Sequence, residues 1–161
     1  MTGVQTCALP ILSAKLMRSI HNLQPDVKTV YGNKRVNYCE GKRIRFGTFG
    51  SDRVFRLYNK IYCTWNNATP HEKVTGHDHR IVLKGNMDHY TIRDRKLYEN
   101  KLELYAHLSA NKYHERGKKA TWVKRYLSPV YGFIKGYIFQ LGFLDGGEGY
   151  WLAKIHARHT R

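Results

Sequence analysis

Cysteine is scarce in this sequence of 161 residues, and its three copies are widely spaced. Cys7, Cys39 and Cys63 form no C-x-x-C pair, the spacing that redox motifs and many structural zinc sites use. The spacing therefore argues against a disulfide framework or a thiolate zinc site, and it fits a reducing cytoplasm.

The sequence also lacks long apolar runs and has few acidic side chains. The sequence holds no run of about 18 apolar residues, so we expect no single helix to span a membrane. Against 28 Lys and Arg stand only 12 Asp and Glu, which gives a formal charge of +16. Such a balance favours anionic partners, namely nucleic acid, nucleotide-sugar phosphates or the anionic face of a bilayer, although a solvated basic surface explains it equally well.

Local patterns predict a mixture of strands and helices. Ser13 predicts the start of a helix through Ile20, because its hydroxyl can accept from free backbone N–H groups of the first turn. The strand predictions are residues 28–65 with breaks at Gly32-Asn33 and Glu40-Gly41, a hairpin of residues 54–58 and 61–65 about Asn59-Lys60, and residues 80–83 ending at Gly85-Asn86.

From about Thr91 onward the apolar period changes to that of a helix. Thr91 and Asp94 predict a capping box at the start of a helix, which ends at Gly117. Its apolar stripe is Tyr98, Leu102, Tyr105 and Leu108. Further along, Pro129 is expected to interrupt any helix, and a last helix is expected from Glu148. The sequence therefore predicts an α/β protein with helices concentrated in its second half.

A short run in the middle of the chain carries the most chemistry. Residues 69–74 read Thr-Pro-His-Glu-Lys-Val, with Arg53 and Arg56 upstream and His89 downstream. A carboxylate beside a histidine can deprotonate a hydroxyl, and a guanidinium offers paired donors to a phosphate. This combination favours transfer of a sugar from a nucleotide donor.

The layout resembles the C-terminal half of a bacterial family 2 glycosyltransferase of the GT-A (nucleotide-diphospho-sugar transferase) fold, of the type that builds lipopolysaccharide core or related envelope glycans. The matching segments are Tyr38-x-x-Gly41-Lys42, Phe55-Arg56-Leu57-Tyr58, His71-Glu72, Asp88-His89-Tyr90, Phe133 to Ile138 and Leu141-Gly-Phe-Leu-Asp-Gly146. The resemblance covers roughly residues 12–161, and the Gly-Phe-Leu-Asp-Gly segment is its most specific part. It implies an acceptor-side mixed sheet and helix followed by C-terminal amphipathic helices.

The resemblance also implies roles for individual residues. Glu72 is the expected general base of an inverting transfer, with His71 orienting it or touching the acceptor. Arg56, and less favourably Arg53, would bind the donor phosphates, because strand alternation would turn only one of them into the site. His89 stands where these enzymes often place a ligand of the diphosphate or of a divalent cation, Mn²⁺ or Mg²⁺, in the full-length enzyme. The expected substrates are a nucleotide diphosphate sugar and a lipid-linked glycan acceptor.

The beginning of the chain does not resemble the family. Residues 1–11 look like the translation of a sequencing-adapter oligonucleotide rather than a signal peptide, since they lack a basic segment. Residues 12–117 then correspond to the C-terminal part of the catalytic domain, and residues 118–161 to a basic amphipathic helical tail. The family's metal-binding and donor-binding Asp-x-Asp occurs nowhere in the sequence, so we expect the chain to be inactive alone.

Basic residues alternate with aromatic ones in the tail, which suits a helix lying in a membrane interface. Each Lys or Arg near anionic lipid is worth about 1 kcal/mol. Together with the resemblance this predicts a peripheral protein at the inner face of the cytoplasmic membrane. The expected interface residues are Lys118, Lys119, Trp122, Lys124, Arg125, Lys135 and Trp151.

Two other functions stay open at this point. The charge and the 21 aromatic residues also suit a nucleic-acid-binding module, although no RNP-type motif, KH loop or zinc finger occurs. A non-catalytic membrane-docking domain would bind anionic vesicles with a blue shift of Trp122 or Trp151 fluorescence. The His77-Asp78-His79 run supplies only part of a metal site and is expected to be a solvated turn.

Overall fold

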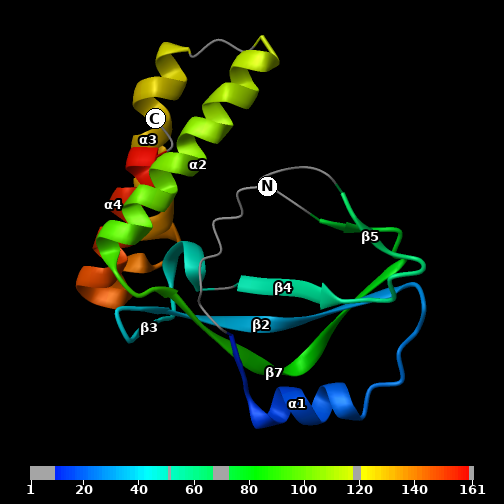
Figure 1. Ribbon diagram of the computed structural model, residues 1–161. Helices are drawn as coiled ribbons and strands as arrows, with labels where there is room; N and C mark the ends of the chain where they lie inside the picture. Colours follow the sequence, from blue (N-terminus) through cyan, green and yellow to red (C-terminus); the bar gives the residue numbers. More distant parts are fainter. Residues whose placement is uncertain (1–9, 51, 67–72, 118–120, 160–161) are drawn as a thin grey trace.

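The computed structural model describes residues 10–50, 52–66, 73–117 and 121–159. They form a mixed α/β fold in which a five-stranded sheet carries helices α2, α3 and α4 at one end and helix α1 against its other side (Figure 1). The strands are β1 (Ile11–Leu12), β2 (Thr29–Cys39), β3 (Lys42–Ile44), β4 (Asp52–Leu57), β5 (Thr64–Trp65), β6 (Val74–Thr75) and β7 (His79–Ile92). The α-helices are α1 (Ala14–His21), α2 (Arg95–Glu115), α3 (Trp122–Ile134) and α4 (Gly146–His159).

The large sheet is mixed, because its two longest strands, β2 and β7, run parallel while the other pairs are antiparallel. Its order is β1-β7-β2-β3, and β4 pairs with β2 beside β3. Strands β5 and β6 form a separate antiparallel pair. This confirms the α/β class and the mixed sheet expected from the sequence.

Two predicted strand breaks are wrong, because the glycines there pack against neighbouring atoms instead of turning the chain. Strand β2 continues through Gly32-Asn33, where a Cβ on Gly32 would lie 2.6 Å from the ring of Phe55. Strand β7 continues through Gly85, whose φ of +115° and contact with α1 also require glycine. The turn at Glu40-Gly41 is confirmed, with φ of +48° and +83°.

The predicted hairpin about Asn59-Lys60 is also wrong. Strand β4 pairs with β2, and β5 pairs with β6. Asn59 starts a local turn, since its side chain accepts from the backbone N–H of Ile61 at 2.9 Å and its carbonyl accepts from that of Cys63 at 2.9 Å. The residue types predicted a turn here correctly, but long-range pairing decided the strand partners.

Helix ends follow the capping rules in most places. Ser13 caps α1 by accepting from the N–H of Leu16 at 3.3 Å, as predicted, and Gly117 with φ of +64° follows the end of α2. The predicted capping box is wrong: Asp94 is itself the N-cap of α2 and accepts from the N–H of Leu97 at 2.8 Å, whereas Thr91 lies inside β7.

Helix α3 does not stop at Pro129, which lies inside it. A proline there leaves the carbonyl of Arg125 without its helical donor, but Arg125 is exposed, so water can satisfy that oxygen. A π-helical turn, Lys135–Phe139, and a short 3-10 turn, Gly142–Asp145, then reverse the chain into α4. Helix α4 begins at Gly146, slightly earlier than the predicted Glu148.

The C-terminal helices share one core with the sheet. The cluster joins buried residues of β2, β3, β7, α2 and α4, namely Cys39, Ile44, Ile92, Tyr98, Leu152 and Ile155. Burial raises the pKa of the Cys39 thiol to about 11, so this cysteine is a packing residue and not a nucleophile. Within the described residues, no helix is both long and apolar enough to cross a bilayer.

Candidate functional site

A row of polar side chains crosses the centre of the large sheet. Arg35 and Asn37 come from β2, Asp52 from β4, and His89 and Thr91 from β7. Arg35 donates to Asp52 Oδ2 from Nε at 2.7 Å and from Nη2, so the two side chains form a charge-assisted pair across the strands. Arg35 and Asn37 are two residues apart on β2, as are His89 and Thr91 on β7, so the two side chains of each strand emerge on the same face.

Asn37 is the most constrained side chain of this row, because it is only 1% exposed and both the nitrogen and the oxygen of its amide are hydrogen-bonded. Its Nδ2 donates to the carbonyl of Phe49 at 3.2 Å, and its Oδ1 accepts from the Thr91 hydroxyl at 2.6 Å. The Thr91 oxygen lies 2.7 Å from His89 Nδ1. Since the threonine has given its single hydrogen to Asn37, its oxygen accepts the Nδ1–H of His89. The lone pair of His89 is therefore on Nε2.

The surroundings keep His89 neutral. Burial lowers the pKa of its imidazole first, and the nearby guanidinium groups of Arg35 and Arg56 lower it further, while Asp52 acts weakly in the opposite sense. Burial and Arg35 likewise lower the pKa of Lys101 on α2. A neutral imidazole with a fixed Nε2 lone pair can accept a proton from a hydroxyl or bind a cation.

A metal site cannot be assembled from the described residues alone. Within them there is no group of three His, Cys, Asp or Glu side chains that could hold an ion. His89 would supply one ligand, and the surrounding Arg35, Arg56 and Lys101 repel a cation. The described residues do not fit a divalent cation, so the metal stays a prediction about a longer enzyme.

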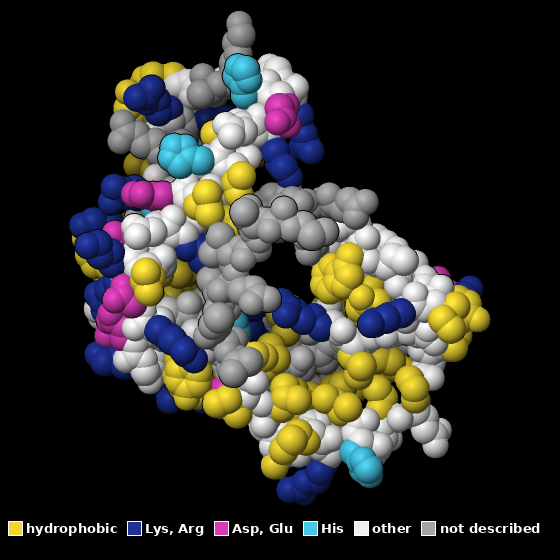
Figure 2. All heavy atoms as spheres, in the orientation of Figure 1, with side chains coloured by type: hydrophobic (Ala, Val, Ile, Leu, Met, Phe, Trp, Pro, Cys, Tyr) yellow, Lys and Arg dark blue, Asp and Glu magenta, His cyan; other side chains and the backbone are white. Residues whose placement is uncertain are grey.

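A cleft of about 500 Å³ lies beside β4. Four consecutive residues of β4 line it, together with Val30 of β2 and residues between β5 and the start of β7. Figure 2 shows Lys and Arg side chains beside an opening on the face that it presents. The lining of the cleft is Val30, Arg53, Val54, Phe55, Arg56, Trp65, Lys73, Val74, His77 and Arg80.

Both predicted phosphate-binding arginines line this cleft. Strand alternation was expected to turn Arg53 and Arg56 to opposite faces of the sheet. The register of β4 against β2 shifts after Phe55, however, and Arg56 is the extra residue of a bulge there. A bulge resets the alternation of side chains, so the two arginines reach the same space. Arg56 also acts on His89, which links the cleft to the polar row.

Glu72 and His71 lie outside the described residues, as do Lys118 and Lys119. Lys73, the residue that follows Glu72 directly, lines the cleft.

The expected membrane residues are only partly on one surface. Trp122 is 70% exposed, and Lys124, Arg125 and Lys135 are exposed along α3 and the turn after it. Trp151 lies elsewhere: it packs against the shared core, with the Arg95 guanidinium 5.0 Å from its ring centre. Sequence reasoning missed Phe139, which is 73% exposed, although the apolar run from Val130 to Leu144 signalled it.

Sequence reasoning also missed Arg35, Asn37 and Thr91. A signal was present, because Arg35 and Asn37 alternate with apolar or aromatic residues along a strand. That pattern predicts a polar face, but only the register with β7 shows that the face carries His89.

Replacing Thr91 with valine is expected to release His89 from its Nδ1–H form, because valine cannot accept that hydrogen. The population of the Nε2–H tautomer should rise. Long-range ¹H–¹⁵N correlation spectra, recorded well above the histidine pKa, report the tautomer directly. Thr91→Ser keeps the hydroxyl and should keep the Nδ1–H form. An unchanged tautomer in Thr91→Val would contradict the hydrogen-bond chain.

Comparison with known proteins adds no assignment. No protein-family model matches the chain, and no solved structure matches it. The residues of the cleft and the polar row are therefore the basis for any functional conclusion.

Proposed function

We propose that this chain is the acceptor-side part of an inverting GT-A-type glycosyltransferase, which moves a sugar from a nucleotide diphosphate sugar to an envelope glycan or lipid-linked acceptor. One observation carries the proposal. Residues far apart in sequence come together here: Arg53, Arg56 and Lys73 line one cleft, and His89 lies within the electrostatic reach of Arg56.

In this proposal Glu72 takes the proton of the acceptor hydroxyl as its oxygen attacks the anomeric carbon. A general base in hydrogen-bond reach contributes about 10²–10⁴-fold to the rate. Arg56 and Arg53 stabilise the negative charge of the departing diphosphate, because a guanidinium donates two parallel hydrogen bonds to phosphate oxygens. His89, neutral and fixed by Thr91, keeps its Nε2 lone pair available to accept a hydrogen bond from a substrate hydroxyl.

Attachment to a membrane surface is part of the proposal. Exposed aromatic and aliphatic residues on α3 and the following turn, among them Trp122, Tyr131 and Phe139, lie on the same segments as Lys124 and Lys135. Apolar side chains can enter the headgroup region while the cations contact anionic lipid. Because Trp151 is packed in the core, Trp122 is the tryptophan expected to shift to the blue on anionic vesicles.

Reading the source DNA across the codon of Leu12 tests the proposal. We expect an apolar strand followed by Asp-x-Asp directly ahead of Leu12, in place of residues 1–11. A chain that truly begins at Met1 would contradict the catalytic proposal and favour the membrane-docking or nucleic-acid-binding alternatives. These separate readily, since a nucleic-acid complex weakens steeply with salt.

A further inference from the structure

The wall of the cleft that faces β4 combines basic and aromatic side chains. Trp65 comes from β5, Lys73 precedes β6, and His77 and Arg80 surround the start of β7. Among the described residues that line the cleft there is no Asp or Glu, whereas four Lys or Arg side chains do so. An open cleft of this size with one sign of charge concentrates anionic ligands.

Arg80 is held in place on this wall. Its Nε donates to His77 Nε2 at 2.8 Å, and its guanidinium carbon lies 5.7 Å from the ring centre of Phe55. These contacts use one N–H and one face of the guanidinium, so its two terminal nitrogens keep their planar donor geometry. A cation held in this way binds an anion with less loss of side-chain freedom than a mobile lysine.

His77 is therefore not the solvated turn residue that the His77-Asp78-His79 run predicts. It is half-buried, lines the cleft and accepts from Arg80, which places its own hydrogen on Nδ1. That Nδ1 is buried and has no partner among the described residues. Asp78 does lie in solvent, paired with Lys28 at 3.5 Å.

Trp65 provides a flat apolar surface in the same cleft. The residue is 41% exposed, and its ring packs edge-on against Tyr58 with a centroid distance of 6.2 Å. An indole that is supported on one side and open on the other can cover the C–H face of a sugar ring while nearby polar groups fix its orientation. A charged group on that sugar would then be within reach of the basic wall.

We propose that this wall, formed by Trp65, Lys73 and Arg80, binds an acidic sugar of the acceptor, one that carries a phosphate or a carboxylate. The inference rests on the proposed function, which makes the bound sugar part of the acceptor. It adds that this acceptor is anionic. A neutral glycan would leave the cations of the wall without a counter-charge.

Calorimetric titration of the 161-residue chain with simple sugars tests this inference. The probes are glucose 6-phosphate, glucuronate, glucose and inorganic phosphate. We expect one acidic sugar to bind at least about tenfold more tightly than glucose and than inorganic phosphate. The tighter of the two acidic sugars identifies the group as phosphate or carboxylate. Equal binding of glucose, equal binding of inorganic phosphate, or no binding of either acidic sugar would overturn the proposal.

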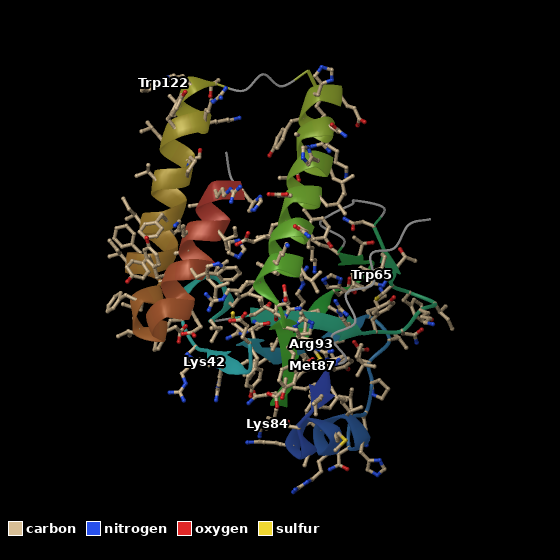
Figure 3. All side chains as sticks on the ribbon, turned by 60° about the vertical axis from the view of Figure 1, so that its left-hand side comes forward. Lys42, Trp65, Lys84, Met87, Arg93 and Trp122 are labelled. Carbon is tan, nitrogen blue, oxygen red and sulfur yellow. The ribbon has the colours of Figure 1, made fainter. Side chains whose placement is uncertain are left out.

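Matched variants locate the binding. Arg80→Ala and Lys73→Ala should each weaken the acidic sugar about tenfold, since each removes a charge-assisted contact. Lys84→Ala removes the same charge from β7 at a position near α1 and away from Trp65, and should leave binding unchanged (Figure 3). Lys73 is exposed, so its removal does not threaten folding. Equal effects of Lys73→Ala and Lys84→Ala would overturn the assignment.

The two proposals fail separately. An Asp-x-Asp ahead of Leu12 without acidic-sugar binding would leave the glycosyltransferase proposal in place and remove the acidic acceptor. Acidic-sugar binding at Lys73 and Arg80 in a chain that begins at Met1 would keep the sugar site and remove catalysis.

Discussion

Replacing Gly149 with alanine is expected to lower the free energy of unfolding by about 3 kcal/mol or more. Gly149 lies buried in α4, where the added Cβ would lie 1.8 Å from the carbonyl oxygen of Gly142 and 3.2 Å from Cβ of Asp145. The nearest atom belongs to the backbone, so no rotation of a side chain relieves the clash. Helix α4 and the turn Gly142–Asp145 must therefore separate.

That separation would reach the sheet, because the same turn is tied to it. The Asp145 carboxylate accepts from the backbone N–H of Arg45 at 3.1 Å and of Phe46 at 2.8 Å. Lys42 Nζ adds an ion pair to Glu148 Oε1 at 2.6 Å, and this hydrogen bond lowers the pKa of Glu148. Moving α4 away from the turn disturbs these contacts and the core that Leu152 and Ile155 share with the sheet.

Gly147→Ala is the matched control for this prediction. It makes the same chemical change in the same helix, but a Cβ there meets no atom within 4 Å. Alanine should be neutral there or stabilise the helix by up to about 1 kcal/mol. Urea denaturation of both variants gives their free energies of unfolding, which are compared when the slope of that free energy against urea concentration is the same in both. Similar stabilities for Gly149→Ala and Gly147→Ala would contradict the close packing.

This packing gives the Gly-Phe-Leu-Asp-Gly segment a structural role. It was the most specific part of the resemblance, yet within the described residues Asp145 binds backbone N–H groups of the sheet and Gly142 receives α4. A sequence segment that carries a resemblance can therefore serve to hold the scaffold together. The chemistry of the proposed site depends on other residues, those of β4 and β7.

Helix caps and turns that depend on neighbouring residues were predictable from the sequence. Features that depend on contacts with distant segments were not. Ser13, Gly117 and Glu40-Gly41 act through their own backbone geometry, so the sequence located them correctly. Gly32 and Gly85 look like turn residues in sequence, but they accommodate Phe55 and α1, which are distant along the chain. No local pattern distinguishes a glycine that turns from a glycine that makes room.

The candidate site divides in the same way. Arg56 and His89 stood out by residue type, and the structure brings them within electrostatic reach of each other. Asn37 and Thr91, which fix the tautomer of His89, became visible only through the register of β2 against β7. Arg80 and His77 were missed because a bond between their side chains is needed to recognise them as one unit.

Replacing Glu72 with glutamine is expected to slow sugar transfer about 10²–10⁴-fold in an enzyme in which an Asp-x-Asp segment precedes Leu12. Glutamine has nearly the shape of glutamate but cannot take a proton, so the acceptor hydroxyl attacks without a base. The loss should appear in kcat with little change in KM, because binding contacts are kept. Initial rates with a labelled nucleotide sugar measure it.

Glu115→Gln is the control, since it removes the same charge at the exposed end of α2. It should leave kcat unchanged. If Glu72→Gln kept more than about a tenth of the rate, proton removal would have to be assigned elsewhere. His89 is then the next group to test, because its Nε2 lone pair is fixed and its pKa is lowered by burial and by Arg35 and Arg56. The burial and the two guanidinium groups that keep His89 neutral leave this second base available at neutral pH.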